Sequence, residues 1–479
     1  MGKVVGILCT DKRWLDRLRR CCADEGLVYT LFRILEMILS KAGLLPKARK
    51  QAMLLALLQD DKTRLEMSMG DLQSALADKE ARIKAMDMEA YRQRMEYECI
   101  RSKLDGINLE NSRFADVMNM SFEHIRNLCL DRNAERVPHG LTAFQGTGLY
   151  AHAAPVVRQA LPSVDFLPEE KLLEKSPDYC FSWGNAIYCN NYAVVMTAMV
   201  KGSVLVNCED GFLRSVDTWC AKDVPERFTK SCSVVFDIYG CYYDASRSSQ
   251  IERMLNDQSL VLSAEQLQEA QRLIRRIVTE RLTKYNHQSQ ATPAVGHKGA
   301  RKVLVVDQSY GDYAIRKEWA DDSTFARMLD DAINENPDAD ILVKTHPDTM
   351  TGAKRGYYDS VKEEGRVFRV TSPVNPYSLF DAVDDVYVCS TQLGFEALMA
   401  GHRMHVYGMP FYAGWGLTID RQKNPRRTRT RSLEEVFYAF YVLYTHWVDP
   451  ETGRPCSIDK AIDWLLKVRD EYARYKAGR

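Results

Sequence analysis

The sequence predicts an α/β protein with two doubly wound units joined by a linker and preceded by a helix-rich N-terminal region. Two short segments carry most of this prediction, residues 303–312 and residues 341–348. Each is an apolar, β-branched run that ends abruptly in polar residues, as a buried parallel strand does at its carboxyl edge. In open α/β sheets, ligands bind in the crevice beyond those edges. The two segments therefore predict a ligand site as well as a fold.

The composition is that of an ordinary globular protein. The chain has 479 residues, enough for two or three domains, of which 46% are hydrophobic and 27% charged. Its formal net charge is zero, so no global field attracts nucleic acid, and no nucleic-acid partner is expected. The 13 cysteines show no CxxC pair and no Cys/His ligand spacing, which favours reduced thiols in a cytoplasmic protein without a metal site. No apolar run is long enough to predict a spanning helix.

Residues 1–135 form the predicted helical N-terminal region. Within it, residues 65–107 follow a heptad frame of apolar side chains that only Lys79 and Gln93 interrupt. This spacing predicts a coiled coil and, through it, a homo-oligomer, although an amphipathic helix packed within its own domain would show the same stripe. Apolar helices around the basic residues 41–50 predict either peripheral contact with the inner face of the cytoplasmic membrane or a buried helical hairpin.

Strands and helices alternate after residue 135. We assign residues 136–290 to an N-terminal Rossmann-like lobe on the acceptor side, and residues 291–479 to a C-terminal Rossmann-like lobe on the donor side. Residues 286–301 are polar and aperiodic, which is typical of a linker. The main predicted strands are 179–183, 203–207, 233–237, 303–307, 341–345, 366–370, 386–389 and 405–407. The predicted helices are 192–200, 263–285 and 323–334, with others starting near 249, 391, 432 and 457. Two such units predict two lobes with a central cleft.

Polar residues follow the two most informative strands. Asp312 lies on a loop after the first, where a carboxylate can act as a nucleophile or general base, held by Gln308. Asp307 competes for the same role, and the residues alone do not decide between them. Lys344 and His346 stand at alternate positions of the second strand, so they are expected to face one side and to bind a phosphate.

Further candidates surround this edge. Ser390 and Thr391 follow a strand and precede a helix, so their hydroxyl groups and backbone N–H groups could cradle a phosphate. Glu209 ends a strand of the first lobe and could exchange a proton with a leaving or accepting oxygen. The predicted substrate-binding residues are Arg214, Arg316, Tyr412 and Trp415. The two arginines could instead form surface salt bridges. The basic residues between 421 and 431 suit an anionic acceptor, a lipid headgroup or RNA, unless they form a solvated loop.

These motifs resemble, in their order along the chain, those of the KpsC-type capsule polysaccharide β-Kdo transferases. The matching segments are residues 209–215, 240–246, 284–286, 303–312, 335–339, 343–348, 390–398, 408–418 and 448–453. Together they extend over roughly residues 175–470. The family's best-known members carry two such modules in tandem, whereas this chain carries one, and residues 1–135 match nothing in the pattern.

The resemblance implies a GT-B-like fold that transfers Kdo, an eight-carbon acidic sugar, from CMP-Kdo to a saccharide or lipid-linked acceptor with retention of configuration. It implies that Asp312 is the nucleophile and Glu209 the candidate acid/base, and that His346, Ser390 and Thr391 hold the CMP phosphate. Gln308, Lys344 and Glu396 complete the predicted donor-binding set. No metal ion or cofactor is expected, because cationic and N–H donors can neutralise the phosphate. Two alternatives stay open, a different nucleotide-sugar donor and a coiled-coil scaffold with a degenerate transferase lobe.

Overall fold

The computed structural model describes residues 122–136, 138, 140–145, 153–184, 189–219, 221, 223–346 and 355–478. Nearly all of them belong to one compact unit, Ile125–Arg479. The predicted coiled coil over residues 65–107 and the basic segment at residues 41–50 lie outside the described residues, so both stay predictions. Among the described helices, none combines the length and the apolar character needed to cross a membrane.

The first sheet is mixed. Its seven strands are β1 (Thr142–Gln145), β2 (Asp165–Leu167), β3 (Tyr179–Trp183), β4 (Val204–Asp210), β5 (Ser233–Asp237), β12 (Thr445–Asp449) and β13 (Arg454–Pro455), in the order β13-β12-β5-β4-β3-β1-β2. Strands β1 to β4 pair in parallel, but β5 runs antiparallel to β4 and β12 antiparallel to β5. A parallel return needs a long crossover, usually a helix, and among the described residues between β4 and β5 the only helical segment is the short 3-10 helix η3 (Glu226–Phe228). The prediction of a doubly wound unit therefore fails on this side of the sheet.

The second sheet is wholly parallel. Its strands are β6 (Arg301–Val306), β7 (Ala339–Lys344), β8 (Val367–Val370), β9 (Asp385–Val388), β10 (Arg403–Val406) and β11 (Ile419–Asp420), in the order β11-β10-β9-β6-β7-β8. The chain starts in the middle at β6, builds outward through β7 and β8, and then returns to β9 on the other side of β6. This order has a topological switch point between β6 and β9, where ligands bind in such sheets.

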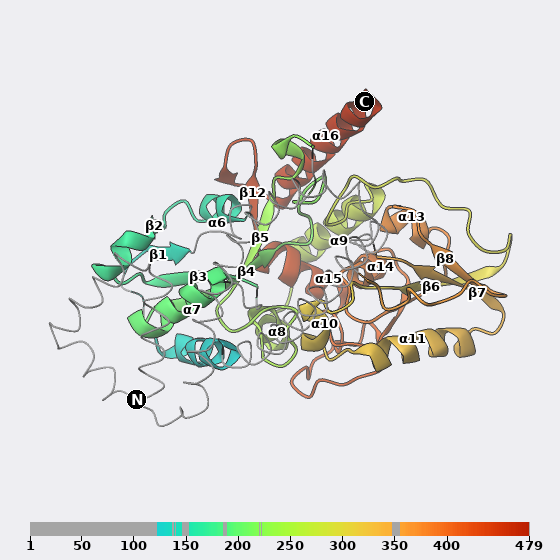
Figure 1. Ribbon diagram of the computed structural model, residues 1–479, viewed down its shortest axis with the longest axis horizontal. Coiled ribbons are helices and arrows are strands. Elements are labelled where there is room, and N and C mark those ends of the chain that lie inside the picture. The colour runs from blue at the N-terminus through green and yellow to red at the C-terminus, as the bar shows by residue number, and fades with distance from the viewer. Residues whose placement is uncertain are drawn as a thin grey trace, which may run out of the picture. The chain divides into compact units, whose positions relative to one another are not determined.

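The remaining elements connect and cover the sheets (Figure 1). The helices are α6 (Ala154–Ala160), α7 (Cys189–Lys201), α8 (Gln250–Asn256), α9 (Ala264–Thr279), α10 (Tyr313–Lys317), α11 (Asp322–Glu335), α13 (Pro376–Phe380), α14 (Leu393–Met399), α15 (Leu433–Phe437) and α16 (Ile458–Ala477). Short 3-10 segments are η1 (Asn133–Glu135) and η2 (Glu169–Leu173), and η4 (Tyr438–Tyr444) is π-helical. The predicted helix 263–285 ends at Thr279, because Arg281 has a φ of +51°, which an α-helix cannot continue.

Alternate residues of β6 face opposite layers of the second sheet. Val303 and Val305 pack with Phe325 of α11, whereas Leu304 and Val306 belong to the large cluster that includes α9, α13 and α14. In Figure 1, α11 covers one face of this sheet, and α13 and α14 lie at the other. Burial on both faces explains why the strand is a continuous apolar run in the sequence.

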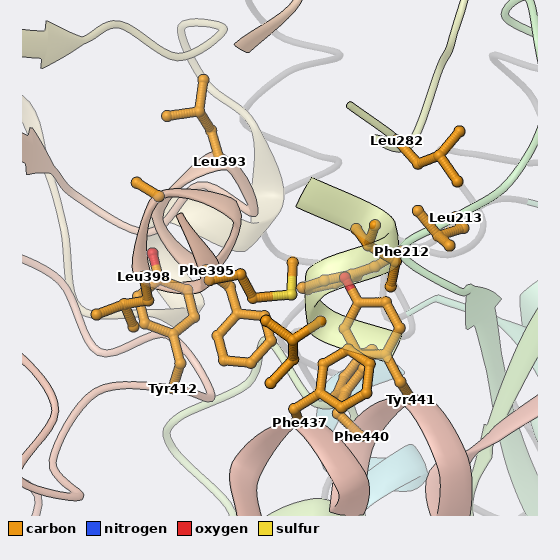
Figure 2. Packing of buried hydrophobic residues seen from close by; sticks show 14 of the residues in the cluster. Phe212, Leu213, Leu282, Leu393, Phe395, Leu398, Tyr412, Phe437, Phe440 and Tyr441 are labelled. Carbon is orange, nitrogen blue, oxygen red and sulfur yellow. The ribbon is translucent and has the colours of Figure 1, made fainter. Parts of the chain in front are cut away.

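A single aromatic core joins elements of both sheets. Phe212, which follows β4, has its ring centroid 4.4 Å from that of Phe440, and the Phe440 ring stacks on Phe411 at 4.4 Å. Figure 2 shows Phe437, Phe440 and Tyr441 projecting from one helical segment toward Phe212. Large aromatic pairs of this kind contribute both buried area and ring geometry to the free energy of folding. The core therefore connects the loop after β4 with the loop after β10.

The chain crosses back to the first sheet after α15. Strand β12 pairs with β5, and the Tyr472 hydroxyl of α16 donates to Asp217 at 2.7 Å. The last part of the sequence thus completes the first sheet. The predicted domain boundaries at residues 135 and 290 stay predictions.

Candidate active site

Gln308 and Ser390 meet at the switch point of the second sheet. Gln308 follows β6 and Ser390 follows β9, the two strands between which the winding reverses. The Ser390 backbone N–H donates to Gln308 Oε1 at 3.0 Å, and Gln308 Nε2 donates to Ser390 Oγ at 3.3 Å. We predicted that Gln308 would hold Asp312 by a hydrogen bond, but the Gln308 side chain bonds to Ser390 instead. Gln308 therefore fixes the loop after β9.

Ser309 and His346 join the next pair of strand ends. Ser309 Oγ lies 3.1 Å from His346 Nδ1, and the carbonyl of Ser309 accepts the backbone N–H of Asp312 at 3.2 Å. Asp312 is therefore one backbone hydrogen bond away from the residue that contacts His346. Ser309 thus links the two residues, whose roles stay predictions.

Asp312 caps the short helix α10. Its side chain accepts the Ala314 backbone N–H at 3.0 Å, and it is exposed. Gly311 has a φ of +73°, a conformation that favours glycine, and this turn leads the chain into the helix with Asp312 at its start. An exposed carboxylate at this edge is available to a ligand.

Asp307 is placed differently, although the sequence allowed it the same role. It is buried, and its carboxylate accepts backbone N–H groups from Gln308 and Tyr357, both at 2.9 Å. Burial raises its pKa to about 6, against the lowering effect of these hydrogen bonds. A Cβ on Gly356 would lie 2.2 Å from Asp307 Oδ2. These contacts favour a role for Asp307 in ordering the loop at residues 355–358.

Lys344 and Glu396 form a buried layer beneath this edge. Lys344 ends β7 and is 6% exposed, and no hydrogen bond or ion pair of its ammonium is found among the described residues. Burial lowers its pKa to about 8, whereas Glu396 and Asp307 act to raise it. Burial likewise raises the pKa of Glu396 to about 7. We predicted that Lys344 and His346 face one side, because alternate residues of a strand do so. Strand β7 ends at Lys344, however, so His346 lies outside it, and the two side chains have different neighbours.

Glu396 supports a segment of the first lobe. The Thr283 hydroxyl and the Lys284 backbone N–H both donate to its carboxylate, and Gln392 Nε2 donates at 3.0 Å. Gln392 Nε2 also donates to the carbonyl of Phe212 at 2.8 Å. The prediction that Glu396 binds the donor stays untested, but its visible contacts tie α14 to the residues after α9.

Ser390 and Thr391 precede the helix N-cap that the sequence assigned to them. Helix α14 begins at Leu393, and its N-cap is Gln392. Thr391 Oγ1 accepts the Leu393 backbone N–H at 3.3 Å, and the Thr391 carbonyl accepts the Tyr412 hydroxyl at 2.7 Å. The two hydroxyl residues therefore form the turn into α14 at the edge where Gln308 and His346 lie.

Glu209 lies in β4 rather than after it, because antiparallel pairing with β5 extends the strand to Asp210. Its Oε1 accepts the Asp210 backbone N–H at 3.0 Å. Burial raises the pKa of Glu209 to about 7; Lys284 opposes this shift, and the charges of Asp210 and Asp312 add to it. Glu209, in β4 of the first sheet, and Asp312, which follows β6 of the second sheet, are therefore close enough to interact electrostatically.

Sequence reasoning missed Glu318. This residue caps the C-terminus of α10, it is buried, and the Ser390 hydroxyl donates to its carboxylate. Burial raises its pKa well above the ordinary range, and Arg427 opposes that shift. Helix α10 thus has the exposed Asp312 at one end and a buried carboxyl bonded to Ser390 at the other. A buried glutamate that ends a short helix carries no sequence signal beyond its spacing from Asp312.

Three of the four predicted substrate-binding side chains are buried within the fold. Arg214 is 1% exposed and donates to Asp210 Oδ1, the Ser215 hydroxyl and the Thr229 carbonyl, each at 2.9 Å. Tyr412 donates to Thr391, and Trp415 Nε1 donates to the carbonyl of Phe411 at 2.8 Å. These geometries favour structural roles, since the polar atoms are already paired. Arg316 alone is exposed, on α10.

Most of the basic residues after 420 form ion pairs and hydrogen bonds within the fold rather than an open basic patch. Arg426 Nε and Arg427 Nε donate to Glu252 of α8 at 2.7 Å and 3.1 Å. Arg431 donates to the carbonyls of Leu255 and Leu260, both at 2.7 Å. Most of these guanidinium groups are therefore engaged with α8 and the loop that follows it, and the hypothesis of a nucleic-acid or lipid surface loses its main residues.

Comparison with known proteins tests the resemblance. Residues 182–448 match the family model described as "Capsule polysaccharide biosynthesis protein". The chain belongs to this family. The family that the motifs indicated is thereby confirmed, over more than half of the chain.

Individual relatives point in the same direction. The chain is 38% identical over 270 residues to the capsule polysaccharide modification protein LipA of Neisseria meningitidis serogroup B (strain ATCC BAA-335 / MC58), covering 54% of this chain and 37% of LipA. It is 35% identical over 275 residues to the lipopolysaccharide-processing protein LpsZ of Rhizobium meliloti, covering 57% and 60% of the two chains. The chain thus spans less than two thirds of the length of either curated relative.

Among the solved structures that resemble this chain is a transferase matched over nearly its whole length. The structure titled Thermosulfurimonas dismutans KpsC, beta Kdo 2,4 transferase, is 33% identical, with a TM-score of 0.61. The match covers 68% of this chain and 98% of that chain. The α/β architecture with two sheets is therefore shared with this relative.

Proposed function

We propose that the chain is a GT-B-type, retaining β-Kdo transferase that moves Kdo from CMP-Kdo to a saccharide or lipid-linked acceptor in the synthesis of a bacterial surface polysaccharide. Its membership of the capsule family and its similarity to a KpsC β-Kdo transferase support this proposal. The observation that carries it is the position of Asp312. Its backbone N–H donates to the carbonyl of Ser309, whose hydroxyl lies 3.1 Å from His346 Nδ1, and its exposed carboxylate interacts electrostatically with Glu209.

The phosphate of the donor would lie beyond the carboxyl ends of β6, β7 and β9. His346 and the Thr391 hydroxyl supply hydrogen-bond donors at this edge, Ser390 shapes the turn between them, and Lys344 adds a buried positive charge beneath it. Charge-assisted hydrogen bonds to a phosphate are stronger than neutral ones, and preorganised donors stabilise a leaving anion. We therefore propose that CMP leaves without a metal ion.

In the first step, an oxygen of the Asp312 carboxylate attacks the anomeric carbon of Kdo. The bond from that carbon to the phosphate oxygen breaks, and its electron pair leaves with CMP. The product is a glycosyl ester on Asp312 with inverted configuration.

In the second step, an acceptor hydroxyl attacks the same carbon. Glu209 takes its proton, and the ester bond to Asp312 breaks to regenerate the carboxylate. Two inversions give overall retention. A carboxyl with a pKa of about 7 suits this base role near neutral pH.

Intact mass measurement after incubation with CMP-Kdo tests the proposal directly. We expect the mass of one Kdo residue to be added to the wild type, peptide mapping to place it on Asp312, and Asp312→Ala to lose the adduct and to lower transfer by orders of magnitude. Asp338→Asn, a change at an exposed residue in the turn before β7, is the matched control.

Other outcomes would replace the proposal. An adduct mapped to Asp307 would move the nucleophile, and wild-type transfer by Asp312→Ala would reject the mechanism. Thermal stabilisation by UDP or GDP but not by CMP would favour another nucleotide sugar. Absence of any nucleotide binding would favour the scaffold alternative.

A further inference from the structure

Lys284 is a cation whose side chain reaches the edge of the candidate site. It lies between α9 and the linker, in the segment that the sequence assigned to a continuous helix. Its side chain is 30% exposed, and its ammonium is 3.7 Å from Asp210 Oδ2. Lys284 also interacts electrostatically with Glu209, so it lies near the proposed base.

The backbone of Lys284 is held from both lobes. Its N–H donates to Glu396 of α14, and its carbonyl accepts the backbone N–H groups of Arg214 and Ser215, both at 3.2 Å. An ordinary surface lysine has no such support. Because these bonds fix the backbone of Lys284, only rotation of its side chain can change the position of its charge.

Two cations, Arg214 and Lys284, lie at the Asp210 carboxylate. Arg214 Nε donates to Asp210 Oδ1 at 2.9 Å, and Arg214 is buried with its other contacts inside the fold. One guanidinium therefore already balances the Asp210 carboxylate. The ammonium of Lys284 is the second cation at the same carboxylate and the only one of the two with substantial exposure. Its remaining donors are available to a bound anion.

The proposed reaction creates a need for such a cation. In Kdo the anomeric carbon carries a carboxylate, so attack by Asp312 brings a second negative charge close to the nucleophile and to Glu209. Like charges at this distance disfavour one another in a partly buried site. Lys344 is buried beneath the edge, and the side chain of Lys317, beside Asp244, is only 12% exposed.

We propose that Lys284 binds the carboxylate of the donor sugar and makes the site selective for 2-keto acid sugars. This inference rests on the proposed function, since it assumes that the sugar lies between Asp312 and Glu209. It also moves to Lys284 the role that the sequence gave to Arg214, whose donors are engaged.

Comparing CMP-Kdo with CMP alone separates this role from a structural one, because CMP lacks the sugar carboxylate. We expect Lys284→Met to lower kcat/KM for CMP-Kdo by about 10- to 100-fold, the usual effect of losing a hydrogen bond to a charged group. The Kd for CMP, measured by calorimetry, should change less than about twofold. Lys284→Arg should recover part of the loss, and Lys298→Met, an exposed lysine in the linker, is the control.

The outcomes distinguish the two proposals. Wild-type kcat/KM in Lys284→Met would overturn the role of Lys284 and leave the transferase intact. Equal losses in CMP affinity and in turnover would show a structural role and also overturn it. If the wild type forms neither product nor adduct from CMP-Kdo, the proposed function fails, and the role of Lys284 fails with it.

Discussion

Gln308 and Ser390 exchange two hydrogen bonds across the switch point of the second sheet, at 3.0 Å and 3.3 Å. Their strands, β6 and β9, are neighbours in the sheet but are separated in the sequence by two strands. A side-chain amide is well suited to this position, because it both donates and accepts. The pair therefore fixes the loop on which Ser390 and Thr391 meet the proposed phosphate.

Gln308→Leu should loosen that loop without changing the size of the side chain. The Ser390 N–H loses its acceptor, so we expect the Kd for CMP to rise about 10-fold. The free energy of unfolding should fall by about 1–2 kcal/mol. Calorimetry and urea denaturation measure the two effects. Gln268→Leu, at an exposed position of α9, is the control, and unchanged CMP affinity in Gln308→Leu would contradict this role.

The second sheet could be predicted from the sequence because its strands are buried on both faces. Residues 303–307 and 341–345 are apolar runs bounded by polar residues, and they coincide closely with β6 and β7. Strands β1 and β2 were not predicted, since they are only 4 and 3 residues long. The antiparallel β5 was predicted as a strand but not in its direction, because periodicity does not encode pairing.

The site was predictable only where residues follow strand ends. Asp312, His346 and Ser390 were predicted in this way; in the structure Ser309 links the first two and Gln308 bonds to Ser390, while their roles stay predictions. Lys284 and Glu318 were missed as site residues, because their positions depend on contacts with Glu396 and Ser390 across long sequence separations. Tyr412 and Trp415 were predicted to bind substrate, but their polar atoms bond to Thr391 and Phe411, since glycine and aromatic residues are equally common in a packed turn.

The pH dependence of transfer should follow Glu209. Its pKa is raised to about 7, and the second step needs it deprotonated. We therefore expect kcat to rise with pH and to level off above about pH 7, with the rising limb absent in Glu209→Gln. Transfer rates measured between about pH 5.5 and pH 9 test this expectation. A rate that falls as the pH passes 7 would instead make Glu209 the acid.

Stability should also depend on pH through Glu396. Burial raises its folded-state pKa from 4.5 to about 7, so the protonated form is favoured on folding. The resulting stabilisation is complete below the unfolded-state pKa and is lost as the pH rises through about 7, by about 3 kcal/mol in all. Glu396→Gln should therefore show a flatter profile of unfolding free energy between about pH 5 and pH 8. Glu209 titrates in the same window, so part of the slope should remain; equal slopes in both proteins would contradict the assignment.

Glu318 should act as a positioning residue. Its carboxyl accepts the Ser390 hydroxyl and ends the helix that Asp312 begins. Glu318→Ala removes this bond, and we expect kcat to fall about 10- to 100-fold while KM for the donor rises. Glu318→Gln keeps an acceptor oxygen at the same position and should recover most of the rate. If the two variants are equally impaired, the charge of Glu318 matters rather than its hydrogen bond with Ser390.

Glu252 should stabilise the fold by pairing with the basic residues after 420. Its carboxylate lies between Arg426 and Arg427, and the side chains of Glu252 and Arg427 are 2% and 3% exposed. Removing one partner of a buried ion pair leaves an uncompensated charge, so Glu252→Gln should lower the free energy of unfolding by about 3 kcal/mol. Adding Arg427→Met should restore part of that loss, because the unpaired charge is then gone. Urea denaturation of the three proteins measures the coupling. A loss below about 0.5 kcal/mol in Glu252→Gln would mean that these arginines behave as solvated surface charges, as the open-loop hypothesis had it.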